Sequence, residues 1–157
     1  MSPIDKWGPA TWAFIHTLSV SIKPDKIQII GPEMFAFIIR ICNNLPCPSC
    51  SEHAKSYINK LMKDQSFIKD KQKFINAMYI FHNDVNIRLK KALFKYEDIN
   101  NTYKKNNLIL IFNKFSKYFN NKNNLNMILE NFHRKKLLND IRRWLLKNIQ
   151  NFEFPKP

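Results

Sequence analysis

The scarcity of glycine is the feature that most constrains the possible folds of this chain, because only Gly8 and Gly31 occur in 157 residues. A β-sandwich or barrel with many tight turns needs glycine wherever the backbone takes a positive φ. Neither glycine belongs to a Gly-x-Gly-x-x-Gly or other glycine-rich phosphate loop, so the sequence argues against a Rossmann-type dinucleotide site. Any nucleotide ligand would have to be held in another way.

Apolar residues recur at helical spacing along almost the whole chain. The clearest stripe lies between residues 71 and 91 and consists of Phe74, Ala77, Met78, Phe81, Val85 and Leu89. Prolines mark most other boundaries and predict helices from Trp7 to Lys23, from Pro32 to about Asn44, and from Pro48 to Lys63. A short helix at 96–105 and longer ones at 108–119 and 125–149 complete the pattern. It predicts an all-α protein, a four-helix bundle with a short fifth helix and a C-terminal helical extension.

Residues 106–157 differ in character from the part before them, and we treat them as a basic helical extension of a core domain at 1–105. Asparagine and lysine dominate 120–126, which predicts a loop. The last helix is amphipathic, with large apolar residues at helical spacing: Leu129, Phe132, Leu138, Ile141 and Leu145. We expect this helix to dock on the bundle or on a second subunit.

The formal net charge of +14 does not by itself indicate a nucleic-acid-binding protein. The chain has 21 lysines and five arginines and is equally rich in asparagine and isoleucine, a skew typical of AT-rich genomes. A surface that reads phosphates would use more arginine, whose guanidinium binds phosphate through paired hydrogen bonds. We therefore do not expect nucleic acid to be the primary partner.

The N-terminus shows no targeting signal, because Met1–Gly8 is polar and carries Asp5 and Lys6. The longest apolar runs, such as residues 108–112, are too short for a transmembrane segment. We expect the protein to stay on the cytoplasmic side of the cell that makes it. Three cysteines in such a compartment favour a metal or redox role over a framework of structural disulfides.

The chemistry of the chain centres on Cys47-Pro48-Ser49-Cys50, at the predicted start of a helix. Two intervening residues bring the two sulfurs within disulfide distance. The helix dipole and the free N–H groups of the first turn stabilise a thiolate at such a position. His53, one turn after Cys50, could assist as a cation or as a hydrogen-bond partner.

The same motif also occurs in thioredoxin-like folds and in zinc sites. A thioredoxin-like fold needs βαβ strands, and the sequence shows no strong strand pattern. Zinc needs about four ligands, and Cys42, Cys47, Cys50 and His53 are available in number. A second Cys-x-x-Cys or histidine pair is missing. A basic helical binding module with a structural zinc site at the cysteines stays open as the alternative.

A polar stripe lies beside the apolar one between residues 71 and 91. His82, Asn86 and Lys90 are spaced four residues apart, and Asn83 lies three residues before Asn86. The first helix carries a similar pair, Trp12 and His16, at the same spacing. Such a combination of indole, imidazoles, amides and a lysine suits an adenine, a ribose and a pyrophosphate.

Three blocks of the sequence, taken together, resemble the Erv/ALR family of FAD-linked sulfhydryl oxidases. They read Trp7-Gly8-Pro9-x-x-Trp12-x-x-x-His16, then Leu45-Pro46-Cys47-x-x-Cys50-x-x-His53-Ala54, then Phe81-His82-Asn83-x-Val85-Asn86-x-x-Leu89-x-Lys91. The blocks follow the family's order, cover about residues 4–105, and are most similar to the short versions carried by large cytoplasmic DNA viruses. The AT-rich composition fits an origin in a giant virus.

The resemblance implies a flavoprotein that oxidises two protein thiols to a disulfide with O₂ as electron acceptor, producing H₂O₂. Cys50 would lie against the flavin of FAD as the charge-transfer thiolate, and Cys47 would form the mixed disulfide with the substrate. The residues implied to line FAD are Trp7, Trp12, His16, Cys50, His53, His82, Asn83, Val85, Asn86, Leu89, Lys91 and Tyr96. The resemblance also implies a homodimer through the first two helices, and the virion as a further location.

The chain departs from many members of the family in one respect. They carry a second, shuttle disulfide on a flexible tail, whereas the only further cysteine here is Cys42, which we predict to be a buried free thiol. A thioredoxin-like adaptor or the protein substrate itself would therefore have to reach Cys47. Residues 106–157 match nothing in the family pattern.

Overall fold

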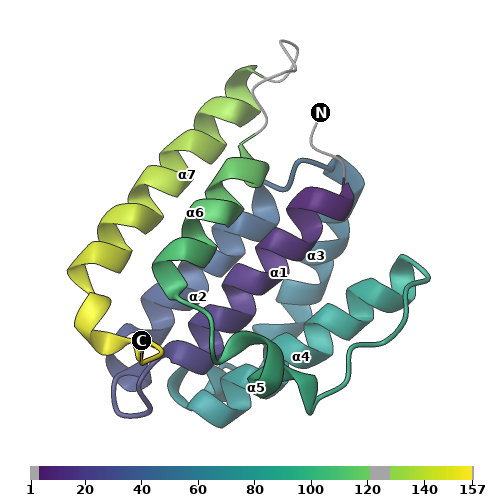
Figure 1. Cartoon of the computed structure of the whole chain (residues 1–157). Coiled ribbons are helices and arrows are strands. Elements are labelled where there is room, and N and C mark those ends of the chain that lie inside the picture. Colours follow the sequence, from purple (N-terminus) through teal and green to yellow (C-terminus); the bar gives the residue numbers. More distant parts are fainter. Residues whose placement is uncertain (1–3, 121–127, 157) are drawn as a thin grey trace.

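The computed structural model describes residues 4–120 and 128–156, and these residues are almost entirely helical (Figure 1). The α-helices are α1 (Ile4–Ser21), α2 (Ile27–Asn43), α3 (Pro48–Leu61), α4 (Lys71–Arg88), α5 (Asp98–Tyr103), α6 (Leu108–Phe119) and α7 (Ile128–Lys147). Short 3₁₀ turns lie at Ser66–Lys69 (η1) and Ile149–Asn151 (η3). No strand occurs within the two described ranges, where an isolated antiparallel bridge joins Ile22 to Phe152. The predicted all-α fold class is confirmed.

Two predicted helix starts are wrong because a proline lies inside the helix rather than at its first residue. α1 begins at Ile4 and contains Pro9, and α2 begins at Ile27 and contains Pro32. A proline beyond the first turn removes one backbone hydrogen bond. The turns before the two prolines are nevertheless kept, because they bury large apolar side chains: Trp7, Ile27 and Ile30.

The ends of α4 and α7 also differ from the prediction. α4 ends at Arg88, and the following Lys90 has a left-handed backbone with φ of 56°. This conformation turns the chain so that the Lys91 N–H donates to the Asn86 carbonyl at 2.8 Å, closing the helix. The last helix is predicted from residue 125, but residues 125–127 lie outside the described residues, and α7 ends at Lys147.

Helices α1 to α4 form the bundle, and a single apolar cluster runs through it and into α6 and α7. The bundle contributes side chains that are almost fully inaccessible: Phe14, Ile15, Leu18, Met34, Phe35, Ile38, Phe74, Met78 and Phe81. Gly31 lets α2 approach the turn η1, because a methyl group at this position would collide with the Ile68 carbonyl oxygen.

The C-terminal extension docks on the bundle, which is one of the two outcomes that its amphipathic pattern predicts (Figure 1). α6 packs along α1, where the Phe14 ring lies 5.0 Å from that of Phe115 and 5.4 Å from that of Phe112. α7 lies against α2, where the Trp144 indole N–H donates to the Glu33 carboxylate at 2.9 Å. The extension and the bundle therefore share one core.

The apolar residues predicted for α7 are divided between two environments. Leu138, Ile141 and Leu145 are buried, as the docking prediction requires. Leu129 and Phe132, in the first turns of the helix, are 65% and 63% exposed. Only the second half of the predicted apolar face therefore contacts the bundle.

Candidate functional site

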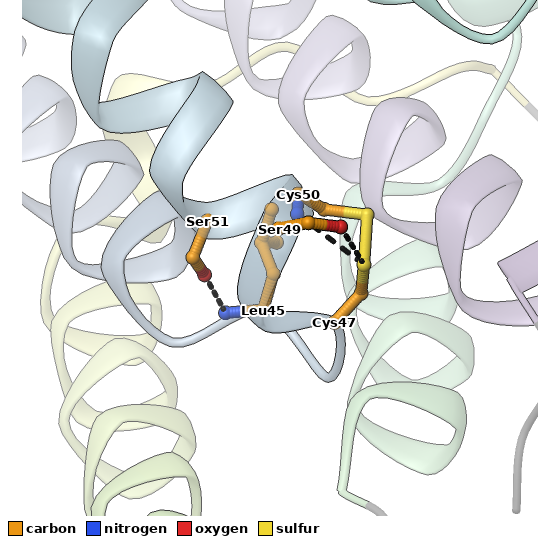
Figure 2. Close-up of a disulfide and its surroundings, with 5 residues drawn as sticks. All are labelled: Leu45, Cys47, Ser49, Cys50 and Ser51. Atoms are coloured by element: carbon orange, nitrogen blue, oxygen red, sulfur yellow. Dashed lines mark hydrogen bonds between the residues drawn. A yellow bond between two sulfur atoms is a disulfide. The ribbon is translucent and has the colours of Figure 1, made fainter.

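Cys47 and Cys50 form a disulfide at the start of α3, with their Cα atoms 5.2 Å apart (Figure 2). Cys47 is the N-cap residue with extended backbone, and Pro48 takes the first helical position, where its missing N–H costs no hydrogen bond. The Cys50 N–H donates to the Cys47 sulfur at 3.3 Å, and the Ser49 hydroxyl lies 3.3 Å from the same sulfur. These donors and the positive end of the helix dipole stabilise a thiolate at Cys47 once the disulfide is reduced.

Beside the pair lies a cavity of about 300 Å³, a volume within the range of small-molecule sites. It is bounded by the N-terminal half of α1, the end of α2, the start of α3 and the second half of α4. Nine predicted site residues line it: Trp7, Trp12, Cys50, His53, His82, Val85, Asn86, Leu89 and Lys91. Cys50 therefore faces the cavity, whereas its partner Cys47 is not among the lining residues.

Three stacked rings form the wall that α1 and α4 share. The Trp12 indole lies 4.3 Å from the His82 ring at an angle of 10°, and 5.6 Å from the His16 ring. His16 Nε2 is 2.9 Å from His82 Nδ1, so in this contact one imidazole donates and the other accepts. His16 is fully buried and its Nδ1 has no hydrogen-bond partner within the described residues.

Burial keeps both imidazoles of this wall neutral. Desolvation, reinforced by repulsion from His82, lowers the pKa of His16 from 6.5 to about 3. Desolvation, with a smaller contribution from the Lys91 ammonium, lowers the pKa of His82 from 6.5 to about 4. At neutral pH both rings are therefore uncharged. His82 borders the cavity, whereas His16 is not among its lining residues.

These shifts predict an acid-sensitive fold. Above pH 6.5 neither the folded nor the unfolded chain protonates the two histidines, so they contribute no pH dependence. Below pH 6.5 the unfolded chain takes up two protons that the folded chain does not bind until about pH 4 and about pH 3. The free energy of unfolding should therefore fall with falling pH, by up to about 2.7 kcal/mol per pH unit from these two groups.

Urea unfolding at a series of pH values measures this slope. Replacing His82 by Gln should remove about half of it, because one of the two linked protons is lost. His133→Gln, on the exposed face of α7, is the control and should leave the slope unchanged. A His82→Gln variant whose free energy of unfolding has the wild-type pH slope would show that the fold does not oppose protonation of His82.

Two predicted residues make contacts that hold the site together: His53, which also lines the cavity, and Asn83, which does not. His53 Nε2 is 2.7 Å from the Asp84 carboxylate, a contact that joins α3 to α4. Asn83 accepts from the Phe94 N–H at 2.7 Å and donates to the Phe94 carbonyl at 3.0 Å, so it fixes the segment that carries Lys91. A role for Asn83 toward a ligand is therefore indirect in this geometry.

Tyr96 lies away from the cavity. Its hydroxyl is hydrogen-bonded to Gln72 and Asn76 on the first turns of α4, and it borders a separate, polar cavity of about 170 Å³. The structure instead brings Phe81, Arg88, Cys42 and Tyr103 to the main cavity. Arg88 lies between the predicted residues Asn86 and Leu89, but a lone arginine at a helix end gives no signal of its own.

Cys42 is a buried free thiol, as the sequence predicts. Desolvation raises its pKa from 9.0 to about 12, so the thiol stays protonated and unreactive as a nucleophile. Its sulfur is not part of the disulfide.

The zinc alternative is not supported. Cys47 and Cys50 are bonded to each other. In residues 4–120 and 128–156, no three His, Cys, Asp or Glu side chains are arranged to hold a metal ion.

Over the same residues, no helix has the length and apolar character needed to cross a membrane.

The fold and the site together define a helical dithiol–disulfide protein, in which a cysteine pair at a helix start borders an aromatic-walled ligand cavity. The chain belongs to the Erv1 / Alr family, whose family model matches residues 9–104. The predicted family is confirmed. No solved structure is significantly similar to the chain.

The chain is similar to viral proteins and to a fungal one. A protein of Invertebrate iridescent virus 6 named as a FAD-linked sulfhydryl oxidase is 35% identical over 99 residues, which is 59% of this chain and 89% of the relative. The FAD-linked sulfhydryl oxidase of an African swine fever virus isolate from Kenya is 29% identical over 97 residues, 62% of this chain and 79% of the relative. The mitochondrial FAD-linked sulfhydryl oxidase erv1 of Schizosaccharomyces pombe is 26% identical over 87 residues, 55% of this chain and 47% of the relative.

Proposed function

We propose that this protein is a FAD-linked sulfhydryl oxidase, which oxidises pairs of thiols in protein substrates to disulfides and passes the electrons to O₂ with formation of H₂O₂. The observation that carries the proposal is the position of Cys50. It is one half of a disulfide at a helix start and at the same time part of the wall of the cavity. A disulfide in this position can exchange with substrate on one side and with a bound cofactor on the other.

The residues around the cavity fit FAD in their chemistry. The stacked Trp12 and His82 rings and the apolar Val85 and Leu89 suit flat aromatic ring systems. Lys91 and Arg88 supply positive charge for a pyrophosphate, and the neutral His82, which contacts the buried His16 behind it, borders the cavity. Bound FAD would supply the two-electron acceptor between the cysteine pair and O₂, a chemistry that protein side chains do not provide.

The cysteine pair performs the thiol exchange. A substrate thiolate attacks the Cys47 sulfur, the Cys47–Cys50 bond breaks, and Cys50 leaves as a thiolate toward the cavity. A second substrate thiolate then attacks the substrate sulfur of the mixed disulfide. The substrate leaves as a disulfide, and Cys47 is released as a thiolate beside the Cys50 N–H and the Ser49 hydroxyl. Two electrons remain on the pair, and the pair is ready for reoxidation.

A direct test uses the purified full chain. We expect a yellow protein that consumes O₂ and produces an equivalent amount of H₂O₂ when dithiothreitol is added. A colourless protein that binds no added FAD and consumes no O₂ would overturn the proposal.

The cofactor site makes a separate prediction for α4. Asn86 is buried and hydrogen-bonded to Asn83. Its replacement by Ala should weaken FAD binding by about 10- to 100-fold, because a buried polar contact is lost. His82→Ala, which removes the ring stacked on Trp12, should have a similar effect. The thermal midpoint should fall together with the FAD content, because FAD binds the folded state only.

Absorbance of the released cofactor and thermal unfolding measure the two quantities. Ile87→Ala is the matched control, since Ile87 neighbours Asn86 on the same helix but is 66% exposed. Equal FAD content and thermal midpoint in Asn86→Ala, His82→Ala and the wild type would exclude α4 as the binding face.

The proposed partners are a protein thiol substrate or a thioredoxin-like adaptor, and O₂. A homodimer through α1 and α2, which the family resemblance implies, would have to use faces of these helices that α6 and α7 leave free. In this chain Phe14 of α1 is covered by α6, and Arg40 of α2 is paired with Asp140 of α7 at 3.0 Å. We propose the cytoplasmic side of the infected cell, or the virion, as the location, because the most similar relatives reported above are viral.

A further inference from the structure

Arg134 of α7 is the only Lys, Arg, Asp or Glu side chain that is buried among residues 4–120 and 128–156. It is 1% exposed, and it belongs to the extension, outside the residues that match the family model. A guanidinium in such a place is costly unless its N–H groups find acceptors. The acceptors that the Arg134 guanidinium contacts therefore indicate its role.

The guanidinium of Arg134 lies at the C-terminal end of α2. Its Nη1 donates to the Asn44 carbonyl at 3.3 Å, and its Nη2 donates to the Asn131 side-chain oxygen at 2.8 Å. Asn44 is the C-cap residue of α2, where helix carbonyls lack partners and the helix dipole is negative. α2 has a cation of its own in its last turn, Arg40, and the Asn44 side chain donates to the Arg40 carbonyl at 2.8 Å. Arg134 adds, from another helix, a second cation and a donor for the Asn44 carbonyl.

The peptide unit that Arg134 contacts is also held from its other side. The Asn44 carbonyl and the Leu45 N–H belong to one planar peptide group. The Leu45 N–H donates to the Ser51 hydroxyl of α3 at 3.0 Å (Figure 2). α7 and α3 therefore fix the orientation of this peptide group between them.

This peptide group stands directly before the redox-active pair. Leu45 and Pro46 alone separate Asn44 from Cys47. Because Cys47 is the N-cap of α3, the direction in which the chain enters it sets where its sulfur lies relative to Cys50 and to the donors of the first turn. A change in the Asn44–Leu45 orientation is thus transmitted to the disulfide.

We propose that Arg134 is a positioning residue for the Cys47–Cys50 pair, and that the C-terminal extension tunes the redox equilibrium of the pair through it. The proposal deepens the oxidase function and rests on it for its biological meaning. Its physical content is independent, because a loosened Asn44–Leu45 peptide lowers the effective concentration of one thiol toward the other. Without Arg134 the disulfide is therefore easier to reduce.

The test is the equilibrium of the pair with dithiothreitol in the full chain, followed by alkylation of free thiols. In Arg134→Met we expect the equilibrium constant for reduction to rise about tenfold, which corresponds to about 30 mV for a two-electron couple. Arg134→Lys keeps the charge but not the forked donors, so it should recover only part of this change. Asn131→Ala removes one acceptor of the fork and should cause a smaller shift in the same direction.

Two further variants make the test specific. Arg143→Met removes a cation from the same helix that is 78% exposed and paired with Asp140, and it should leave the equilibrium unchanged. Ser51→Ala releases the other side of the same peptide group and should act like Arg134→Met. The double variant should show less than the sum of the two shifts, because both act on one peptide group.

The outcomes separate positioning from a merely structural role. If Arg134→Met lowers the thermal midpoint but leaves the redox equilibrium within twofold of the wild type, the proposal is overturned. Should Arg134→Met fail to fold, Arg134→Lys and Asn131→Ala decide by the same criterion. A shift in Arg143→Met as large as that in the Arg134 variants would overturn it too. Since alkylation in the absence of O₂ reads the thiol–disulfide equilibrium and not turnover, failure of the proposed oxidase function would be seen separately.

Discussion

Cys50→Ser is expected to lower the oxidation of dithiothreitol by more than about 1000-fold while FAD stays bound. The expectation follows from the geometry of the pair. Cys50 supplies the sulfur at the cavity wall, and without it the chain has no disulfide to accept the substrate thiol. FAD should remain because the aromatic and polar lining, not one sulfur, makes up most of the cavity.

Cys47→Ser should lower turnover to the same extent but give a different visible absorption spectrum. Cys50 would then be a free thiol against the cavity, and we expect a long-wavelength absorption band from its contact with the bound flavin. O₂ consumption and the visible spectrum of the two variants test this pair of expectations. Ile87→Ala, at an exposed position of α4 that does not line the cavity, is the control and should retain turnover.

The assignment of the pair is open to a simple refutation. Wild-type rates of dithiothreitol oxidation in Cys47→Ser or Cys50→Ser would mean that another group accepts the substrate thiols. Loss of both turnover and FAD in Cys50→Ser alone would instead show that the sulfur is needed to hold the cofactor.

Phe115→Ala in α6 should cost about 3–5 kcal/mol in the free energy of unfolding, which is a large part of the stability of a domain of this size. The Phe115 ring is fully buried and lies 5.0 Å from the Phe14 ring and 4.8 Å from that of Phe119. Removing it opens a cavity between α1 and the extension that the neighbouring rings cannot fill. The variant therefore measures how much α6 contributes to the oxidase fold.

Urea unfolding of the full chain gives the number. Leu110→Ala on the same helix is the control, because Leu110 is 66% exposed and should change the free energy by no more than about 0.5 kcal/mol. A loss below about 1 kcal/mol in Phe115→Ala would show that α6 is only loosely attached. The prediction of an independent domain at 1–105 would then gain support.

The position of α1 explains why the extension matters to the site. Phe14 points to α6, while Trp12 and His16 of the same helix contact His82 at the cavity. A helix held on one side by the extension thus carries, on another side, the rings that we propose to bind FAD. We expect FAD to be less firmly held in Phe115→Ala because α1 is less firmly fixed.

The sequence by itself determined the local features of this protein. Apolar spacing predicted the helices, and the bounds of α6 agree with the predicted 108–119. The Cys-x-x-Cys motif after Leu45-Pro46 predicted a cysteine pair at a helix start, and α3 begins there at Pro48. These features depend on residues within a turn or two of each other, which is why a pattern along the chain reveals them.

In two places, contacts with distant parts of the chain outweigh a local preference. Pro9 and Pro32 suggest helix starts, but burial of the preceding turns extends α1 and α2 past them. Asn83 belongs to the polar stripe of α4, yet its amide pairs with Phe94 from beyond the helix. No spacing rule reveals either outcome, because each depends on what packs there from elsewhere in the chain.

Only the tertiary structure decided which surface the extension covers and what Arg134 does. The amphipathic pattern predicts that α7 buries one face, but it does not predict that this face lies on α2. In sequence, Arg134 is one of several cations among the charged residues of the helix, and nothing local distinguishes it from the exposed Arg143. Its burial and its bond to the Asn44 carbonyl join residues 90 positions apart. Such a contact forms because the last carbonyls of a helix have no donors within the helix ladder, and the folded chain brings Arg134 to one of them.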